Sequence, residues 1–202
     1  MYLTLFLIVI TSAVSITAFN NHELFNKLRF NAYLTVHKKQ YIRLLSHALI
    51  HGSWMHLIIN MYVLWIFGQF VENAFTILFK YGKFWYMLMY ILAVPFSAIP
   101  ALIKQKNNHY YNAVGASGAV SAIVFTAILL QPHMSLFIMF IPIPVPAYIF
   151  GILYLIYSYF MSKRPGADNI AHDAHFAGSI FGFTFPILLN PGLFANFIQQ
   201  IF

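Results

Sequence analysis

One apolar stretch begins with a turn of small residues: GASGAVSAIVFTAILL, residues 115–130. The turn places the hydroxyl of Ser117 just inside a segment with the composition of a membrane-spanning helix. A second motif, AHFAG at residues 174–178, opens another apolar segment and carries His175. Polar groups inside lipid are costly and tend to mark function. The two motifs therefore predict a serine and a histidine that act within a membrane.

The composition points to the same environment. Of the 202 residues, 61% are hydrophobic and only 7% are charged, whereas a soluble domain carries about 25% charged residues. Backbone groups in lipid must be satisfied internally, and the alternating pattern of barrel strands is absent, so we expect helices. The predicted fold class is an all-α polytopic membrane protein, with residues 1–202 in one domain. The absence of cysteine excludes disulfides, thiolate metal sites and a cysteine nucleophile.

The hydrophobic pattern predicts six spans, which are residues 1–19, 53–72, 84–103, 113–130, 146–161 and 170–189. Ser53 is a candidate cap of the second span. Residues 20–46 mix basic and aromatic side chains and suit a segment lying along the membrane surface. Residues 131–146 contain four prolines and predict an interfacial loop. With six spans, residues 47–60, Ser117 and His175 lie on one side of the membrane.

The polar residues near these helix starts suit acyl-transfer chemistry. A serine hydroxyl is a poor nucleophile until a base takes its proton, and His175 is the available base for Ser117. Hydrogen-bond donors must also face the carbonyl oxygen, where negative charge develops. His56 and Asn60 are spaced i, i+4 and share one helix face, so both can supply donors together with the backbone N–H of Ser117.

Four glycines would bring these groups together. Gly115 and Gly118 allow the backbone around Ser117 to approach its neighbours closely. Gly178 and Gly182 form a face of small residues, which predicts tight packing of the sixth helix on a neighbour, the fourth being the candidate. That packing would bring the catalytic candidates into one cavity.

These motifs resemble those of the rhomboid intramembrane serine proteases of bacterial type, which have six transmembrane helices. The resemblance covers the whole chain and rests on the GASG turn, the Ala174-His175 motif with its glycines, and four polar residues in order, His47, His51, His56 and Asn60. Gly68 followed by Glu72 also resembles the end of that family's second helix.

The resemblance implies the role of each residue. Ser117 would be the nucleophile and His175 the general base of a dyad without a carboxylate, and His56 and Asn60 would serve the oxyanion hole. No cofactor or metal is implied. Substrates would be single transmembrane segments, cleaved near their outer end after lateral access beside the second and fifth helices. The protein would lie in the bilayer of a bacterial inner membrane, with its active site towards the outer side.

The sequence departs from the family at two places. A Trp-Arg pair that is frequent in the first loop is Ile42-Arg43 here, so the anchoring of that loop is expected to differ. An aromatic residue that often lies one turn after the serine, beside the catalytic histidine, is Ser121 here. We expect Ser121 itself or a water molecule to take its place.

Two other classes of function remain open. An inactive relative would bind membrane clients without cutting them. A metal-binding transporter or metalloprotease is suggested by the nine histidines, but such a site needs HExxH or carboxylate ligands, and the acids are only Glu23, Glu72, Asp168 and Asp173. Asp173 is two residues from His175 on the same helix, so it does not complete a triad. We interpret His47, His51 and His172 as structural.

The charges disagree with the orientation that the resemblance implies. The net charge of +7 suits anionic lipid headgroups rather than a nucleic acid. The positive-inside rule would place the loops beside Ser117 in the cytoplasm, because they hold most of the cations: Lys27, Arg29, Lys38, Lys39, Arg43, Lys104, Lys106, Lys163 and Arg164, against Lys80 and Lys83 on the other side. We follow the resemblance, because five of these nine charges lie in one long interfacial segment. The oligomeric state and the substrate are not determined by the sequence.

Overall fold

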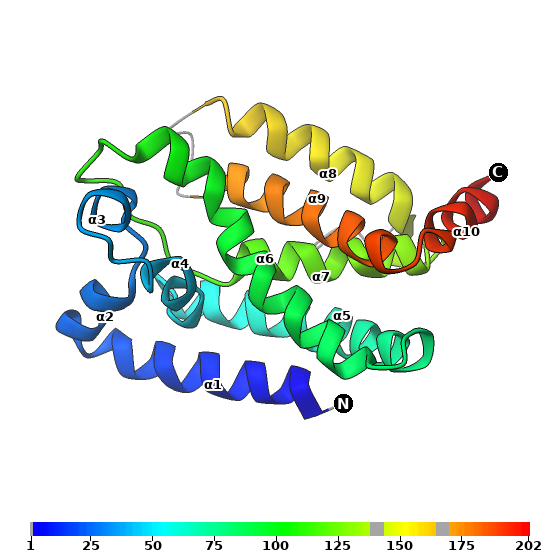
Figure 1. The fold of residues 1–202 in the computed structure, drawn as a ribbon, viewed down its shortest axis with the longest axis horizontal. Coiled ribbons are helices and arrows are strands. Elements are labelled where there is room, and N and C mark those ends of the chain that lie inside the picture. Colours follow the sequence, from blue (N-terminus) through cyan, green and yellow to red (C-terminus); the bar gives the residue numbers. More distant parts are fainter. Residues whose placement is uncertain (1, 138–143, 165–169) are drawn as a thin grey trace.

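A computed structural model describes residues 2–137, 144–164 and 170–202. The described chain is a helical bundle (Figure 1), and the prediction of an all-α membrane protein is confirmed. The six predicted spans correspond to α1 (Tyr2–Phe19), α5 (Trp54–Leu78), α6 (Gly82–Gln105), α7 (Ser117–Leu130), α8 (Ala147–Met161) and α9 (His172–Leu189).

The helices differ in their capacity to cross a membrane. Among the described residues, α1, α5 and α6 are long and apolar enough to span, and α9 joins them if it is counted with α10 (Gly192–Ile201), from which it is bent by 117°. The helices α7 and α8 have 14 and 15 residues, or about 21–23 Å, whereas the apolar core of a bilayer is about 30 Å thick. These two helices are shorter than a full span.

The short helix α7 is the centre of the bundle. It contacts α5, α6, α8 and α9, and 11 of its 14 residues are buried. Because its neighbours surround it, α7 does not need the length of a lipid-facing span.

The prediction for the start of α7 is wrong: it placed the first residue of this helix at Ala113, four residues before Ser117. Gly115 has a φ of +112°, a left-handed conformation that cannot belong to a right-handed helix. Ala113 instead pairs with Phe30 through two backbone hydrogen bonds of 2.9 and 3.1 Å. This pairing ties the turn before Ser117 to the segment 20–46.

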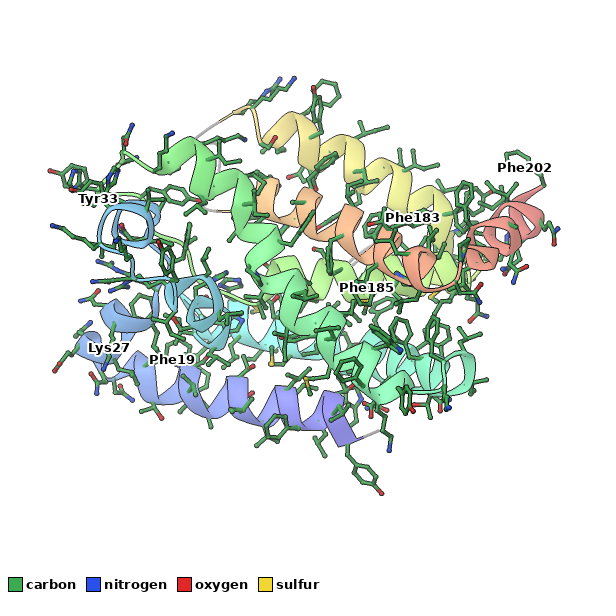
Figure 2. The ribbon with its side chains drawn as sticks, viewed as in Figure 1. Phe19, Lys27, Tyr33, Phe183, Phe185 and Phe202 are labelled. Carbon is green, nitrogen blue, oxygen red and sulfur yellow. The ribbon has the colours of Figure 1, made fainter. Side chains whose placement is uncertain are left out.

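Segment 20–46 is itself helical, and with η1 it covers one end of the bundle. It contains α2 (His22–Leu28), α3 (Ala32–His37) and α4 (Arg43–Ser46), and the 3₁₀ helix η1 (His47–Leu49) follows. These elements lie where α5, α7 and α9 begin (Figure 1). Figure 2 shows Lys27 and Tyr33 at this end and Phe202 at the opposite end. The helix starts that carry the polar motifs are therefore on one side, as the six-span count predicts.

Arg43 anchors this segment without the tryptophan that is frequent in the family. Its Nη1 donates to the carbonyl oxygens of Asn26 at 2.8 Å and Arg29 at 2.7 Å, while Ile42 is 67% exposed. Burial, and secondarily the charge of Arg29, lowers the pKa of Arg43.

Two predicted loops are only partly described. In the proline-rich stretch, β1 (Ser135–Phe137) pairs antiparallel with β2 (Pro144–Pro146), so that stretch contains two short strands rather than irregular loop alone. Residues 138–143 lie outside the described residues. The same is true of Pro165 and Gly166, two residues whose presence in the loop 162–169 predicts a mobile lid there.

Candidate active site

Helices α7 and α9 meet backbone to backbone. A methyl group added at Gly178 would overlap the carbonyl oxygen of Gly118, and one added at Gly182 would overlap that of Ala122. The Oγ1 of Thr126 also donates to the carbonyl oxygen of Gly182 at 2.7 Å. This is the close contact that the small-residue spacing predicts, and only glycine permits it.

This interface brings the two polar motifs together. Ser117 is the first residue of α7, and His175 lies in the first turn of α9. Between them, a methyl group on Gly118 would lie only 3.4 Å from the carbonyl oxygen of Ala174. Both Ser117 and His175 are partly exposed. A hydroxyl and an imidazole from distant parts of the sequence therefore stand at adjacent helix starts.

The turn before Ser117 is held by the residues that precede α5. The N–H of Gly115 donates to the carbonyl oxygen of His47 at 2.9 Å. The N–H of Ala116 points at Nε2 of His51 at 3.5 Å. The successive N–H groups of Gly115 and Ala116 are thus directed at two histidine residues. These contacts hold the backbone just before Ser117 through residues that do not belong to α7.

The hydrogen bonds around His51 define its tautomer. The hydroxyl of Ser15 on α1 donates to the carbonyl oxygen of Leu49 at 2.9 Å, so the 3.0 Å contact between Ser15 and His51 has Nδ1–H as its donor. This leaves a lone pair on Nε2 to accept from Ala116. Burial, and secondarily the nearby ring of His56, lowers the pKa of His51 to about 3, so the imidazole is neutral at physiological pH. His51 thus links α1 to the turn before Ser117.

The helix face that carries His56 and Asn60 reaches this turn. Ser53 caps α5, with its Oγ accepting from the N–H of His56 at 3.2 Å. A methyl group on Gly115 would lie 2.6 Å from Cε1 and 2.8 Å from Nε2 of His56, so the imidazole rests against the glycine. The amide of Asn60 is buried and donates to the carbonyl oxygen of His56 at 2.8 Å. One of its two N–H groups is therefore directed into its own helix.

A cavity of about 30 Å³ lies beside the serine, which is room for a water molecule. Its wall includes His47, Ser97, Ala113, Gly115, Ser117 and Ala174. The cavity is bordered by residues of α6 and of segment 20–46 together with the turn before Ser117.

Known proteins of similar sequence identify the family of the chain. A sequence profile described as the Rhomboid domain matches residues 38–192. The mitochondrial RHOMBOID-like protein 12 of Arabidopsis thaliana is 31% identical over a match of 147 residues, with coverage of 67% of this chain and 43% of that protein. This chain therefore covers less than half of the plant relative's length. The chain belongs to the rhomboid family.

Together with the apolar helices, rhomboid membership makes this an integral membrane protein.

The carboxylate of Asp173, near His175, has other partners. It accepts from the N–H of Ala174 at 2.9 Å and forms an ion pair of 3.5 Å with Lys104. Within residues 2–137, 144–164 and 170–202, no three histidine or acidic side chains are grouped as a metal site would require.

A ring from another helix lies beside His175, and the expectation that Ser121 itself or a water molecule takes the place of the rhomboid aromatic stays a prediction. Tyr154 of α8 lies parallel to the imidazole of His175, with ring centroids 6.4 Å apart and an interplanar angle of 19°. Its hydroxyl is 3.3 Å from Oγ of Ser121. No signal in the sequence singled out Tyr154, because aromatic residues make up 19% of the chain and α8 carries several of them.

Proposed function

We propose that this protein is an intramembrane serine endopeptidase that cleaves membrane proteins in or near their transmembrane segments. The observation that carries the proposal is the backbone contact of α7 with α9, which places the start of the Ser117 helix against the start of the His175 helix. Membership of the rhomboid family supports it.

In the proposed reaction, His175 takes the proton of the Ser117 hydroxyl as Oγ attacks the carbonyl carbon of the scissile bond. The carbonyl oxygen becomes negatively charged as a tetrahedral intermediate forms. When that intermediate collapses, the C–N bond breaks and His175 returns the proton to the leaving amine. Water, deprotonated by the same imidazole, then releases the acyl group and restores the serine.

Three donors suit the negative charge on the intermediate. The N–H of Ser117 is at the amino terminus of α7, where the first N–H groups have no partner within the helix and the helix dipole favours an anion. The ring of His56, packed on Gly115, and the second N–H of Asn60 are the side-chain candidates. Donors preorganised around such an oxyanion are worth about 10²–10³-fold in kcat each.

A transmembrane substrate has to reach the serine sideways. Helix α8 suits this route, because only Ala147, Gly151 and Ser158 are buried along it, and its outward residues include the 57%-exposed Leu153 and the 60%-exposed Phe160. We place substrate access beside α8, since separating it from the bundle uncovers less apolar surface than moving α7 would.

The test of the proposal is the change of Ser117 to alanine. Cleavage of a transmembrane substrate in detergent micelles should be abolished, while the purified variant keeps the thermal unfolding midpoint of the wild type. A fluorophosphonate probe should label the wild type at Ser117 and leave the variant unlabelled. Undiminished cleavage by the variant would contradict the proposal, and a folded wild type that neither cleaves nor labels would indicate an inactive client-binding relative.

A further inference from the structure

The side chain of Tyr154 lies where three helices meet. Its ring packs on Phe125 of α7, with centroids 5.9 Å apart, and on Phe150 one turn earlier in α8, with centroids 5.7 Å apart. The third ring beside it is His175 of α9. With its hydroxyl at Ser121, the tyrosine is held at both its ring and its polar end.

The side chain of Tyr154 is anchored by residues of α7, the helix that begins at Ser117. Ser117, Ser121 and Phe125 are spaced i, i+4, i+8 and follow one face of α7. Ser121 meets the tyrosine hydroxyl and Phe125 meets its ring. The position of Tyr154 is therefore set one and two turns below the serine, on the serine's own face.

A ring placed in this way restricts the imidazole. A general base works only when its lone pair is aimed at the proton that it takes, and rotation about the two side-chain torsions of a histidine moves that lone pair. Offset parallel aromatic pairs with centroids within about 7 Å attract each other. The parallel ring of Tyr154 favours one plane for His175.

We propose that Tyr154 is the positioning residue for His175, and that α8 thereby supplies the orientation of the base as well as the border of the substrate path. This inference rests on the proposed protease function. Displacement of α8 during substrate access would remove the ring from the imidazole, so the base is oriented only when α8 has packed back against α7 and α9.

Tyr157 offers a matched control on the same helix. It lies about one turn after Tyr154, and its ring meets His172 edge-on, with centroids 5.3 Å apart. It is 52% exposed. Loss of Tyr157 thus removes a ring of the same size from α8 without removing the parallel contact with His175.

The experiment compares Tyr154→Leu, Tyr154→Phe and Tyr157→Leu in detergent and in liposomes. For Tyr154→Leu, we expect kcat for a transmembrane substrate and the rate of fluorophosphonate labelling to fall by about ten- to a hundredfold, the range for a misplaced catalytic group, with KM unchanged. Tyr154→Phe keeps the ring and should stay within a few fold of the wild type. Tyr157→Leu should label and cleave normally.

A fourth variant moves the ring instead of deleting it. Ser121→Tyr combined with Tyr154→Ser exchanges the two side chains, so that the ring reaches His175 from α7. Labelling should recover towards the wild-type rate. This variant keeps the test decisive even if Tyr154→Leu fails to fold, because a folded exchange variant without activity would contradict the proposal.

The outcomes separate the two proposals. A wild type that is not labelled at Ser117 contradicts the protease function. A wild type that is labelled, with Tyr154→Leu labelled and turned over equally fast, contradicts only the positioning role. Equal losses in Tyr154→Leu and Tyr157→Leu, each with a lowered unfolding midpoint, would show that both rings merely stabilise α8 and would also overturn it.

Discussion

Helices α8 and α9, two of the neighbours of α7, hold it in different ways. On the α9 side, glycines bring backbone against backbone, and a single added methyl group would overlap a carbonyl oxygen. On the α8 side, contact is made by rings and flexible apolar side chains, and only 3 of the 15 residues of α8 are buried, compared with 11 of the 14 in α7. Figure 1 shows α8 at the edge of the bundle beside α9.

This difference assigns different tasks to the two interfaces. Glycine contacts fix the spacing of Ser117 and His175, because an interface without side chains cannot slide or repack without overlap. The contacts of α8 can separate and re-form at lower cost, since they bury less surface. In our proposal the α9 side sets the distance between nucleophile and base, while the α8 side controls access and the orientation of the base.

The strongest test of this contrast is to cross-link α8 to α7. A methyl group on Gly151 of α8 would lie 3.7 Å from Cγ2 of Ile128 on α7, so cysteines at these two positions are close enough to cross-link. The wild-type chain has no cysteine to compete. Cross-linking should stop most cleavage of a transmembrane substrate, leave fluorophosphonate labelling of Ser117 nearly unchanged, and be reversed by reductant. Equal suppression of both would show that the link distorts the site.

The second test addresses the oxyanion donors on α5. His56→Ala and Asn60→Ala should each lower kcat by roughly 10²–10³, the loss for one such donor. Probe labelling should persist at a reduced rate, because the nucleophile and base remain. Asn60→Asp, which replaces the donor amide with a carboxylate, should be at least as impaired as the alanine variant. Unchanged turnover in both alanine variants would remove α5 from the chemistry.

The third test compares one methyl group at each interface. Gly178→Ala overlaps the carbonyl oxygen of Gly118, a backbone atom that cannot move away, and should destabilise the protein by about 1–3 kcal/mol. Gly151→Ala meets only side-chain atoms at 3.2–3.7 Å and should cost less. The measurement is the thermal unfolding midpoint together with the labelling rate. Equal effects of the two substitutions would break the contrast between the interfaces.

A fourth test uses pH on the residues that hold the turn before Ser117. Burial lowers the pKa of His47 to about 4 and that of His51 to about 3, against about 6.5 in an unfolded chain. The folded state binds fewer protons, so its stability is complete above pH 6.5 and falls as the pH drops towards 4. The loss is at most about 1.4 kcal/mol per histidine for each pH unit below 6.5.

The measurement is the unfolding midpoint between pH 7.5 and 5. His51→Gln should flatten this profile, because it removes one titrating group. A profile that is unchanged in the variant would contradict this assignment of the pH dependence.

The sequence predicted the parts of this architecture that follow from local pattern. The hydrophobic segments predicted the helices. The spacing of Gly178 and Gly182 predicted the contact of α9 with α7, because small residues one turn apart allow two helices to pack closely. The start of α7 was wrong, since the left-handed conformation of Gly115 and its neighbour's pairing with Phe30 depend on tertiary contacts. Tyr154 was missed for a related reason: its partner His175 is on another helix, and one tyrosine among many carries no pattern.

The smallest effect is expected for a change of Asp173. This change tests whether Ser117 and His175 act as a dyad without a carboxylate. The carboxylate caps its own helix at Ala174 and pairs with Lys104, which is about half exposed, and such ion pairs contribute about 0.2–1 kcal/mol. Asp173→Asn keeps an oxygen that can accept the N–H of Ala174, so kcat should stay within a few fold of the wild type and the unfolding midpoint should change little. Lys104→Gln, which removes the other partner, should behave alike. If Asp173→Asn instead lowers kcat by more than a hundredfold while Lys104→Gln does not, the carboxylate supports His175 and the dyad must be replaced by a triad.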